Sequence, residues 1–143
     1  MGTPVGLPRG SQVTAAVLGL FGLMTLVTSA AVLFNFGGAS ETAGDYVPVV
    51  VWMNFFAAFL YLAATYGFLA RKAWTPAVLA MALVLLGVAA IGFFMHVRAG
   101  GDHEQRTMGA LVFRIFVTGM LYAAARYYVR TFSRKPTSRT TTT

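Results

Sequence analysis

Four long runs of apolar residues dominate the chain, and short polar segments separate them. The runs cover roughly Val13–Phe36, Val47–Ala70, Trp74–Val97 and Met108–Val129. A helix needs about 20 apolar residues to cross a hydrocarbon layer about 30 Å thick, and each run reaches that length. The pattern predicts an all-α fold: an integral membrane bundle of four antiparallel transmembrane helices, over about residues 13–36, 47–70, 74–97 and 107–130.

Little of the chain lies outside these runs. We expect a single membrane domain over residues 1–132, followed by a basic, Thr-rich tail over residues 133–143 that we expect to be disordered. Pro48 and Pro76 fall in the first turn of the second and third predicted helices. A proline there loses no hydrogen bond that the helix needs.

The composition supports a membrane protein. Hydrophobic residues make up 57% of the chain and charged residues 10%, which is too apolar for an ordinary soluble domain. The first run is longer than the about 7–15 residues of a signal-peptide core, so we expect it to be retained as a helix. The chain has no cysteine, which excludes disulfides, thiolate metal sites and thiol redox chemistry.

The charges are distributed unevenly about the predicted bundle. The segments expected on one side hold Arg9, Arg71, Lys72, Arg126, Arg130, Arg134, Lys135 and Arg139, whereas the opposite loops hold Arg98, Arg106, Glu41, Asp45, Asp102 and Glu104. The positive-inside rule then predicts that both termini are cytoplasmic, in a cell inner membrane. We expect the bilayer as a partner and anionic lipid headgroups at the basic tail, with a specific phospholipid or partner site as the alternative. No nucleic-acid partner is expected.

Arg114 lies about seven residues, or roughly 10 Å, inside the fourth predicted helix. A charge at that depth is costly and indicates a functional site by default. Other polar side chains are expected at a similar level, namely Asn54, Thr25, Thr28, Ser29 and Thr118. We therefore predict a buried polar layer around Arg114. The alternatives are that Arg114 pairs with Glu104 or Asp45, that it binds a ligand or ion, or that it meets a carboxylate of a partner protein.

Small residues repeat along the predicted helices and would allow close helix packing. They are Ala15, Gly19 and Gly22 in the first helix, Ala63 and Gly67 in the second, Ala80, Gly87 and Ala90 in the third, and Gly119 and Ala123 in the fourth. The stripes predict either a compact bundle or contacts with another subunit.

The loop before the fourth helix brings His96, Asp102, His103 and Glu104 close together in the sequence. These residue types could bind zinc or another divalent metal, but their spacing matches no strong metal signature. Asp102 and Glu104 also suit the start of a helix, where anions meet the positive end of the dipole. A haem would need both histidine rings to face each other across a gap. A quinone site could use His96, Arg114, Asn54 and the Phe93–Phe94 pair. No cofactor is favoured.

Two segments carry a resemblance. The stretch His103-Glu104-Gln105-Arg106-Thr107, followed by Ala110, Phe113 and Arg114, and the stretch from Asn54-Phe55-Phe56-Ala57 to Tyr61 resemble segments of small uncharacterised bacterial four-helix membrane proteins. The resemblance implies a bacterial origin and a four-helix form, and it carries no activity. It also suggests that Glu104, Thr107 and Arg114 belong to one feature. Small multidrug transporters, by contrast, need a glutamate in their first helix, which this chain lacks.

The sequence shows no catalytic constellation. Together with short loops and small-residue stripes, this favours a non-enzymatic accessory or assembly subunit of a larger membrane complex, with a membrane-protein partner or a second copy of the chain beside it. The first alternative is a quinone- or cofactor-binding redox anchor. The second is an oligomeric transporter or channel.

Overall fold

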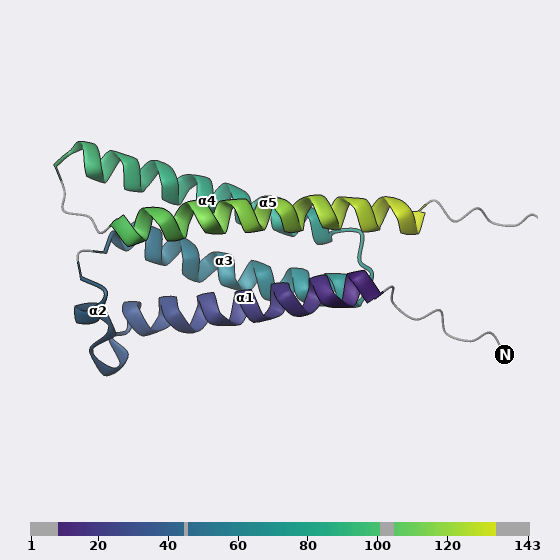
Figure 1. Ribbon diagram of the computed structural model, residues 1–143, viewed down its shortest axis with the longest axis horizontal. Coiled ribbons are helices and arrows are strands. Elements are labelled where there is room, and N and C mark those ends of the chain that lie inside the picture. The colour runs from purple at the N-terminus through teal and green to yellow at the C-terminus, as the bar shows by residue number, and fades with distance from the viewer. Residues whose placement is uncertain (1–8, 45, 101–104, 134–143) are drawn as a thin grey trace, which may run out of the picture.

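The computed structural model describes residues 9–44, 46–100 and 105–133. It contains long helices α1 (Arg9–Leu33), α3 (Pro48–Leu69), α4 (Thr75–Arg98) and α5 (Gln105–Ser133), with a short connection formed by η1 (Phe36–Gly38) and α2 (Ala39–Thr42). The four long helices run antiparallel (Figure 1), which confirms the predicted all-α, four-helix architecture.

The helices pack in the order α1, α3, α4, α5. α3 lies between α1 and α4, and α4 packs against α5, whereas α1 and α5 approach each other at only a few positions in the described part of the chain. Arg9, Arg71, Lys72, Arg126 and Arg130 lie where α1 begins, α3 joins α4 and α5 ends, and we call this the basic end. The other end of the bundle carries α2 (Figure 1).

The first helix differs from its expected bounds at both ends. α1 begins at Arg9 rather than near residue 13 and ends at Leu33 rather than near residue 36. Asn35, at φ 51°, and Gly37, at φ 62°, adopt left-handed backbone conformations that end the helix. The side-chain oxygen Oδ1 of Asn35 accepts hydrogen bonds from the Ser40 backbone N–H at 3.2 Å and its hydroxyl at 2.6 Å, which ties the turn to α2. The other three helices differ from their expected bounds by at most three residues at either end.

Small residues allow α1 to approach α3 closely. A side chain at Gly22 would meet Tyr61 Cβ at 2.9 Å, and one at Gly19 would meet Thr65 Cγ2 at 3.1 Å. Ala15 and Leu18 on the same side of α1 are buried. The first predicted stripe therefore forms the α1–α3 contact.

The small pair of the last helix does not face the bundle. α5 turns Leu111, Thr118 and Ala125, spaced seven residues apart, towards its neighbours. Gly119 and Ala123 fall on another face: nothing in the described structure lies within 4 Å of a side chain built at Gly119, and Ala123 is exposed. These two residues take no part in packing the bundle.

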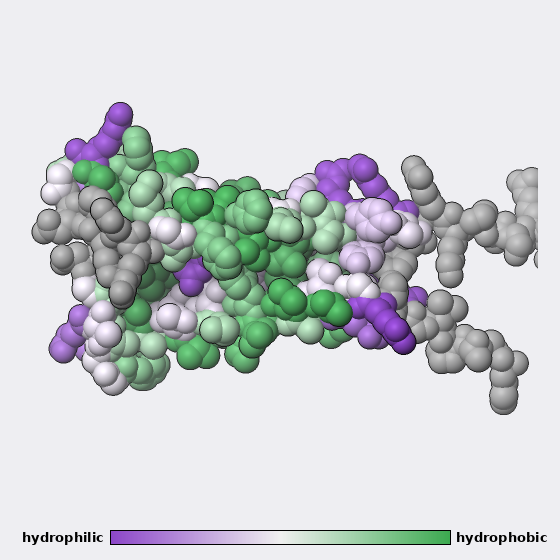
Figure 2. Space-filling model, viewed as in Figure 1, coloured by the Kyte–Doolittle hydropathy of each residue, from purple (hydrophilic) through white to green (hydrophobic). Residues whose placement is uncertain are grey.

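The surface between the ends of the bundle is apolar. Large hydrophobic side chains are exposed on all four long helices, and Figure 2 shows a hydrophobic band with hydrophilic residues gathered mainly at the two ends. Each of the four helices is long and apolar enough to cross a membrane. The chain is thus a small multi-pass integral membrane protein with four spans.

The close α1–α3 contact predicts a difference between two glycines. Gly22→Leu should lower the free energy of unfolding by about 1–3 kcal/mol, because the new side chain must displace Tyr61. Gly87→Leu is the matched control: no described atom lies within 4 Å of a side chain built there, and we expect a change within about 0.5 kcal/mol. Denaturation by sodium dodecyl sulfate, followed by circular dichroism, measures both. Equal losses would contradict the assigned contact.

Candidate functional site

A cavity of about 300 Å³ lies between α1, α3, α5 and the connection that contains α2. We call it the polar cavity. Its walls come from Thr28, Val32, Thr42, Ala43, Tyr46, Val50, Val51, Asn54, Ala110 and Arg114. Of the six residues predicted for the site, three therefore line one cavity although they come from three helices, namely Arg114, Asn54 and Thr28.

Arg114 supplies the charge of the polar cavity. It lies nine residues after the start of α5, about 14 Å along the helix axis, and it is half-buried. Glu41 is the one carboxylate in the described part of the chain, where it is exposed on α2, and no ion pair with Arg114 is present there. Asp45 and Glu104, the partners considered from the sequence, lie outside the described residues.

Asn54 supplies an unsatisfied acceptor. It is 4% exposed, and none of the described residues donates a hydrogen bond to its side-chain oxygen Oδ1. A buried acceptor without a donor costs about 1–3 kcal/mol. Asn54 lines the polar cavity, but its Oδ1 is enclosed by protein, so the side chain must turn before a group in the cavity can donate to that oxygen.

Thr118 lies one turn from Arg114 and is fully buried. Its hydroxyl donates a hydrogen bond to the Arg114 carbonyl oxygen at 2.7 Å and lies 2.6 Å from the hydroxyl of Tyr61. A threonine hydroxyl has one hydrogen, so Tyr61 must be the donor in the second bond. Thr118 thus links the backbone at Arg114 to α3.

Tyr61 is the residue of this region that sequence reasoning missed as a polar participant. It is fully buried, and its ring lies 5.3 Å from the ring of Phe21 on α1. Its position seven residues after Asn54 would place both on one face of a helix, and that spacing is the signal that could have identified it. An aromatic residue in an apolar run is, however, ordinarily a packing residue.

The hydroxyls on α1 have a different arrangement. Thr28 lines the polar cavity, and its hydroxyl donates to the Met24 carbonyl oxygen within the helix. Thr25 and Ser29 are buried but do not line the polar cavity. Thr28 is therefore the α1 residue placed to present an oxygen to a group in the cavity.

His96 lies apart from the polar cavity. It is half-buried near the end of α4 and does not line that cavity. Phe93 and Phe94 line another pocket, of about 250 Å³, between α4 and α5. The residues considered for a quinone site are thus divided, with Asn54 and Arg114 on one pocket and the two phenylalanines on another.

No metal cluster forms among the described residues, since no three His, Cys, Asp or Glu side chains gather there. The other weak metal candidates beside His96 lie outside the described residues, namely Asp102, His103 and Glu104. The suggested association of Glu104 with Arg114 therefore also involves a residue outside them.

The polar cavity can hold a group that carries oxygen. A guanidinium stays charged under all physiological conditions and can donate two parallel hydrogen bonds to a carboxylate or phosphate. Asn54 Oδ1, once its side chain turns towards the cavity, could accept a hydrogen bond from an N–H or O–H of the same group.

Comparison with known proteins found no match to any family model, to any curated protein or to any solved structure.

The buried pair of hydroxyls predicts a coupling energy. Thr118→Val alone should destabilise the protein because it leaves the Tyr61 hydroxyl without a partner. In the Tyr61→Phe background, Thr118→Val should lower the free energy of unfolding by a smaller amount. The two losses should differ by about 0.6–1.7 kcal/mol, the range of hydrogen bonds within membrane bundles. Unfolding of the wild type, both single variants and the double variant measures it. Additive losses would exclude a stabilising bond between the two hydroxyls.

Proposed function

We propose that this protein is a non-catalytic accessory or assembly subunit of a larger membrane complex, and that the polar cavity receives a polar group of its partner. The proposal rests on two polar residues of one cavity that lack partners for their side-chain groups. Arg114 has no carboxylate partner among the described residues, and Asn54 Oδ1 has no donor there.

The physical reason is the cost of leaving such groups alone in a membrane. Ionisable side chains within transmembrane segments usually pair with one another or line a path for a substrate. A carboxylate from a partner's helix would accept hydrogen bonds from the guanidinium. Once the enclosed Asn54 side chain turns towards the cavity, an adjacent N–H or hydroxyl would donate to its Oδ1. One polar partner segment could therefore satisfy both residues.

The packing of the bundle leaves room for such a partner. α1 and α5 both contribute to the polar cavity, yet they hardly contact each other. On another face of α5, Gly119 and Ala123 present a smooth surface that would let a further helix approach closely. A heterologous partner or a second copy of the chain could use either face.

Small-molecule binding, as in a quinone- or cofactor-binding redox anchor, is a second candidate. A volume of about 300 Å³ lies at the lower end of the range for ligand pockets, and a quinone oxygen could accept hydrogen bonds from Arg114. The separation of Phe93, Phe94 and His96 from the polar cavity counts against the particular quinone site considered from the sequence.

Native mass spectrometry of protein extracted gently from its own membrane tests the first proposal. We expect a mass that includes another polypeptide, and Arg114→Gln should reduce the fraction in complex at least about tenfold, equivalent to about 1.4 kcal/mol. Arg98→Gln is the control, because Arg98 is exposed and its guanidinium lies over Phe94 rather than in the polar cavity.

The other outcomes of that measurement discriminate the alternatives. A bound non-protein mass that disappears with Arg114→Gln would favour the small-molecule site. A pure multiple of the 15.3 kDa chain would contradict a heterologous partner and turn attention to oligomeric transport. Circular dichroism of each variant separates loss of binding from loss of fold.

We further propose that the protein lies in a bacterial inner membrane with its basic end in the cytoplasm. The described cations support this orientation, since five of them, Arg9, Arg71, Lys72, Arg126 and Arg130, gather at one end, whereas two, Arg98 and Arg106, lie at the other. The positive-inside rule relates such a bias to the cytoplasmic side.

The natural absence of cysteine makes the orientation measurable. Ala99 and Ala73 are exposed at opposite ends of α4, so Ala99→Cys and Ala73→Cys form a matched pair. In intact cells a membrane-impermeant maleimide should label the first variant and spare the second, and permeabilised cells should label both. The reverse pattern would invert the proposed topology.

A further inference from the structure

A second basic feature lies far from the polar cavity, at the basic end. A groove of about 370 Å³ runs between the beginning of α4 and the last part of α5. We call it the basic groove. One side is formed by Ala73, in the turn before α4, and by Pro76, Ala77 and Ala80 of α4; α5 contributes Tyr122, Arg126, Val129 and Arg130.

The two sides of the basic groove differ in chemistry. The α4 side presents only small apolar residues, whereas the α5 side carries two guanidinium groups. Arg126 is held in place, because its Nη1 donates a hydrogen bond to the Tyr122 hydroxyl at 3.0 Å and its guanidinium carbon lies 5.8 Å from the centre of the Tyr122 ring. Arg130 is one turn further along α5.

The local charge is positive and uncompensated within the described residues. Glu41, the one carboxylate there, belongs to α2 at the other end of the bundle. The first turn of α4 contains no acidic residue, so the positive end of a 24-residue helix adds to the two arginines. Such an arrangement favours an anion with several oxygens, and arginine pairs well with phosphate.

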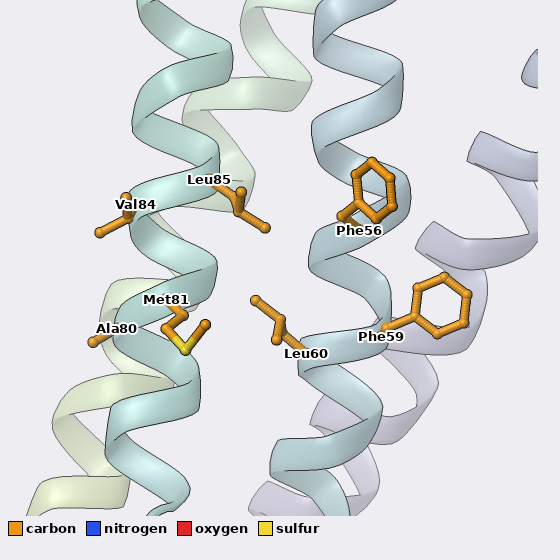
Figure 3. A pocket seen from close by; sticks show the side chains of 7 residues that line it. All are labelled: Phe56, Phe59, Leu60, Ala80, Met81, Val84 and Leu85. Atoms are coloured by element: carbon orange, nitrogen blue, oxygen red, sulfur yellow. The ribbon is translucent and has the colours of Figure 1, made fainter.

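An apolar groove adjoins the basic groove on the membrane side. It measures about 800 Å³ and lies between α3 and α4, with Phe56, Phe59, Leu60, Ala80, Met81, Val84 and Leu85 around it. Figure 3 shows Leu60, Met81 and Leu85 directed into the space between α3 and α4, and Ala80 and Val84 on the side of α4 away from α3.

Ala80 lines both grooves. From Ala80 to Leu85 the apolar groove continues along α4 for five residues, about 7.5 Å, towards the middle of the predicted span. An anion site at the end of the bundle therefore leads directly into a hydrocarbon-lined groove. This succession matches the shape of a phospholipid, which has a charged headgroup followed by acyl chains.

We propose that the basic groove and the apolar groove together form a specific site for one anionic phospholipid. The headgroup phosphate lies against Arg126 and Arg130, and an acyl chain passes Ala80 and lies along the apolar groove. Basic pockets between transmembrane helices are known to hold anionic headgroups in this manner. The site does not depend on the function proposed for Arg114.

Lipid titration followed by native mass spectrometry tests this site. The purified protein in detergent is titrated with phosphatidylglycerol and, separately, with zwitterionic phosphatidylcholine of the same acyl chains. We expect one phosphatidylglycerol to bind at least about tenfold more tightly than phosphatidylcholine. Equal retention of the two lipids would mean that the grooves carry ordinary annular lipid, and would overturn the proposal.

Paired variants separate the groove from general attraction of charge. Arg126→Gln with Arg130→Gln should weaken phosphatidylglycerol binding about tenfold or more. Arg9→Gln with Lys72→Gln removes the same charge from the same end but from residues outside both grooves, and it should change binding less than about threefold. An equal loss in the two pairs would overturn the specific site.

Two further measurements address the acyl chain and the source of the phosphate. Ala80→Phe should weaken phosphatidylglycerol binding without changing charge, because its ring occupies the junction of the grooves. Ala99→Phe is the control, since Ala99 is exposed at the other end of α4, and it should not weaken binding.

Millimolar inorganic phosphate should fail to displace the lipid. Displacement by phosphate, with no effect of Ala80→Phe, would assign a soluble phosphate site instead. Circular dichroism confirms that each variant is folded.

Discussion

Polar groups within the hydrocarbon layer must find their hydrogen-bond partners inside the protein, because no water is available there. The backbone meets this demand through four long helices. Several threonines meet it locally: Thr14, Thr28, Thr65 and Thr118 each donate to the carbonyl oxygen four residues earlier. Two buried side-chain atoms depart from this pattern within the described residues, Ser11 Oγ and Asn54 Oδ1. Of these two residues, Asn54 lines the polar cavity.

Tyr61 joins three of the four helices. It extends from α3, lies against Gly22 and Phe21 of α1, and donates its hydroxyl to Thr118 of α5. The same residue thus lies where α1 and α3 approach each other closely at Gly22, and it hydrogen-bonds the turn of α5 that carries Arg114. Packing and the polar layer are therefore coupled through one buried side chain, although they differ in chemistry.

The last helix carries the cations of both candidate sites. Arg114 lies in the polar cavity and Arg126 in the basic groove, separated by 12 residues, or about 18 Å along α5. α5 packs mainly on α4 and hardly meets α1, so much of its surface is available to lipid or to another protein. Because α5 is only partly enclosed by the bundle, its arginines can face partners at two depths in the membrane.

The membrane class and the four spans follow from the sequence because they depend on the length and hydropathy of continuous segments. The same local count predicts Arg114 about seven residues inside the last helix, whereas the structure places it nine residues inside because α5 begins at Gln105. The count also leads to the expectation that Asn54 and Thr28 lie at a similar level. The left-handed turn at Asn35, which shortens α1, was not anticipated, since asparagine is compatible with several backbone conformations.

The rotation of each helix about its axis was decided only by the tertiary structure. Small residues occur on several faces, and the sequence could not say that Gly22 packs while Gly119 faces outward. Nor could it pair Tyr61 with Thr118, 57 residues away, or divide His96 from Arg114. Lipid tolerates every face of an apolar helix, so hydropathy does not indicate which face packs against a neighbouring helix. Side-chain shape and the few buried hydrogen bonds determine that face.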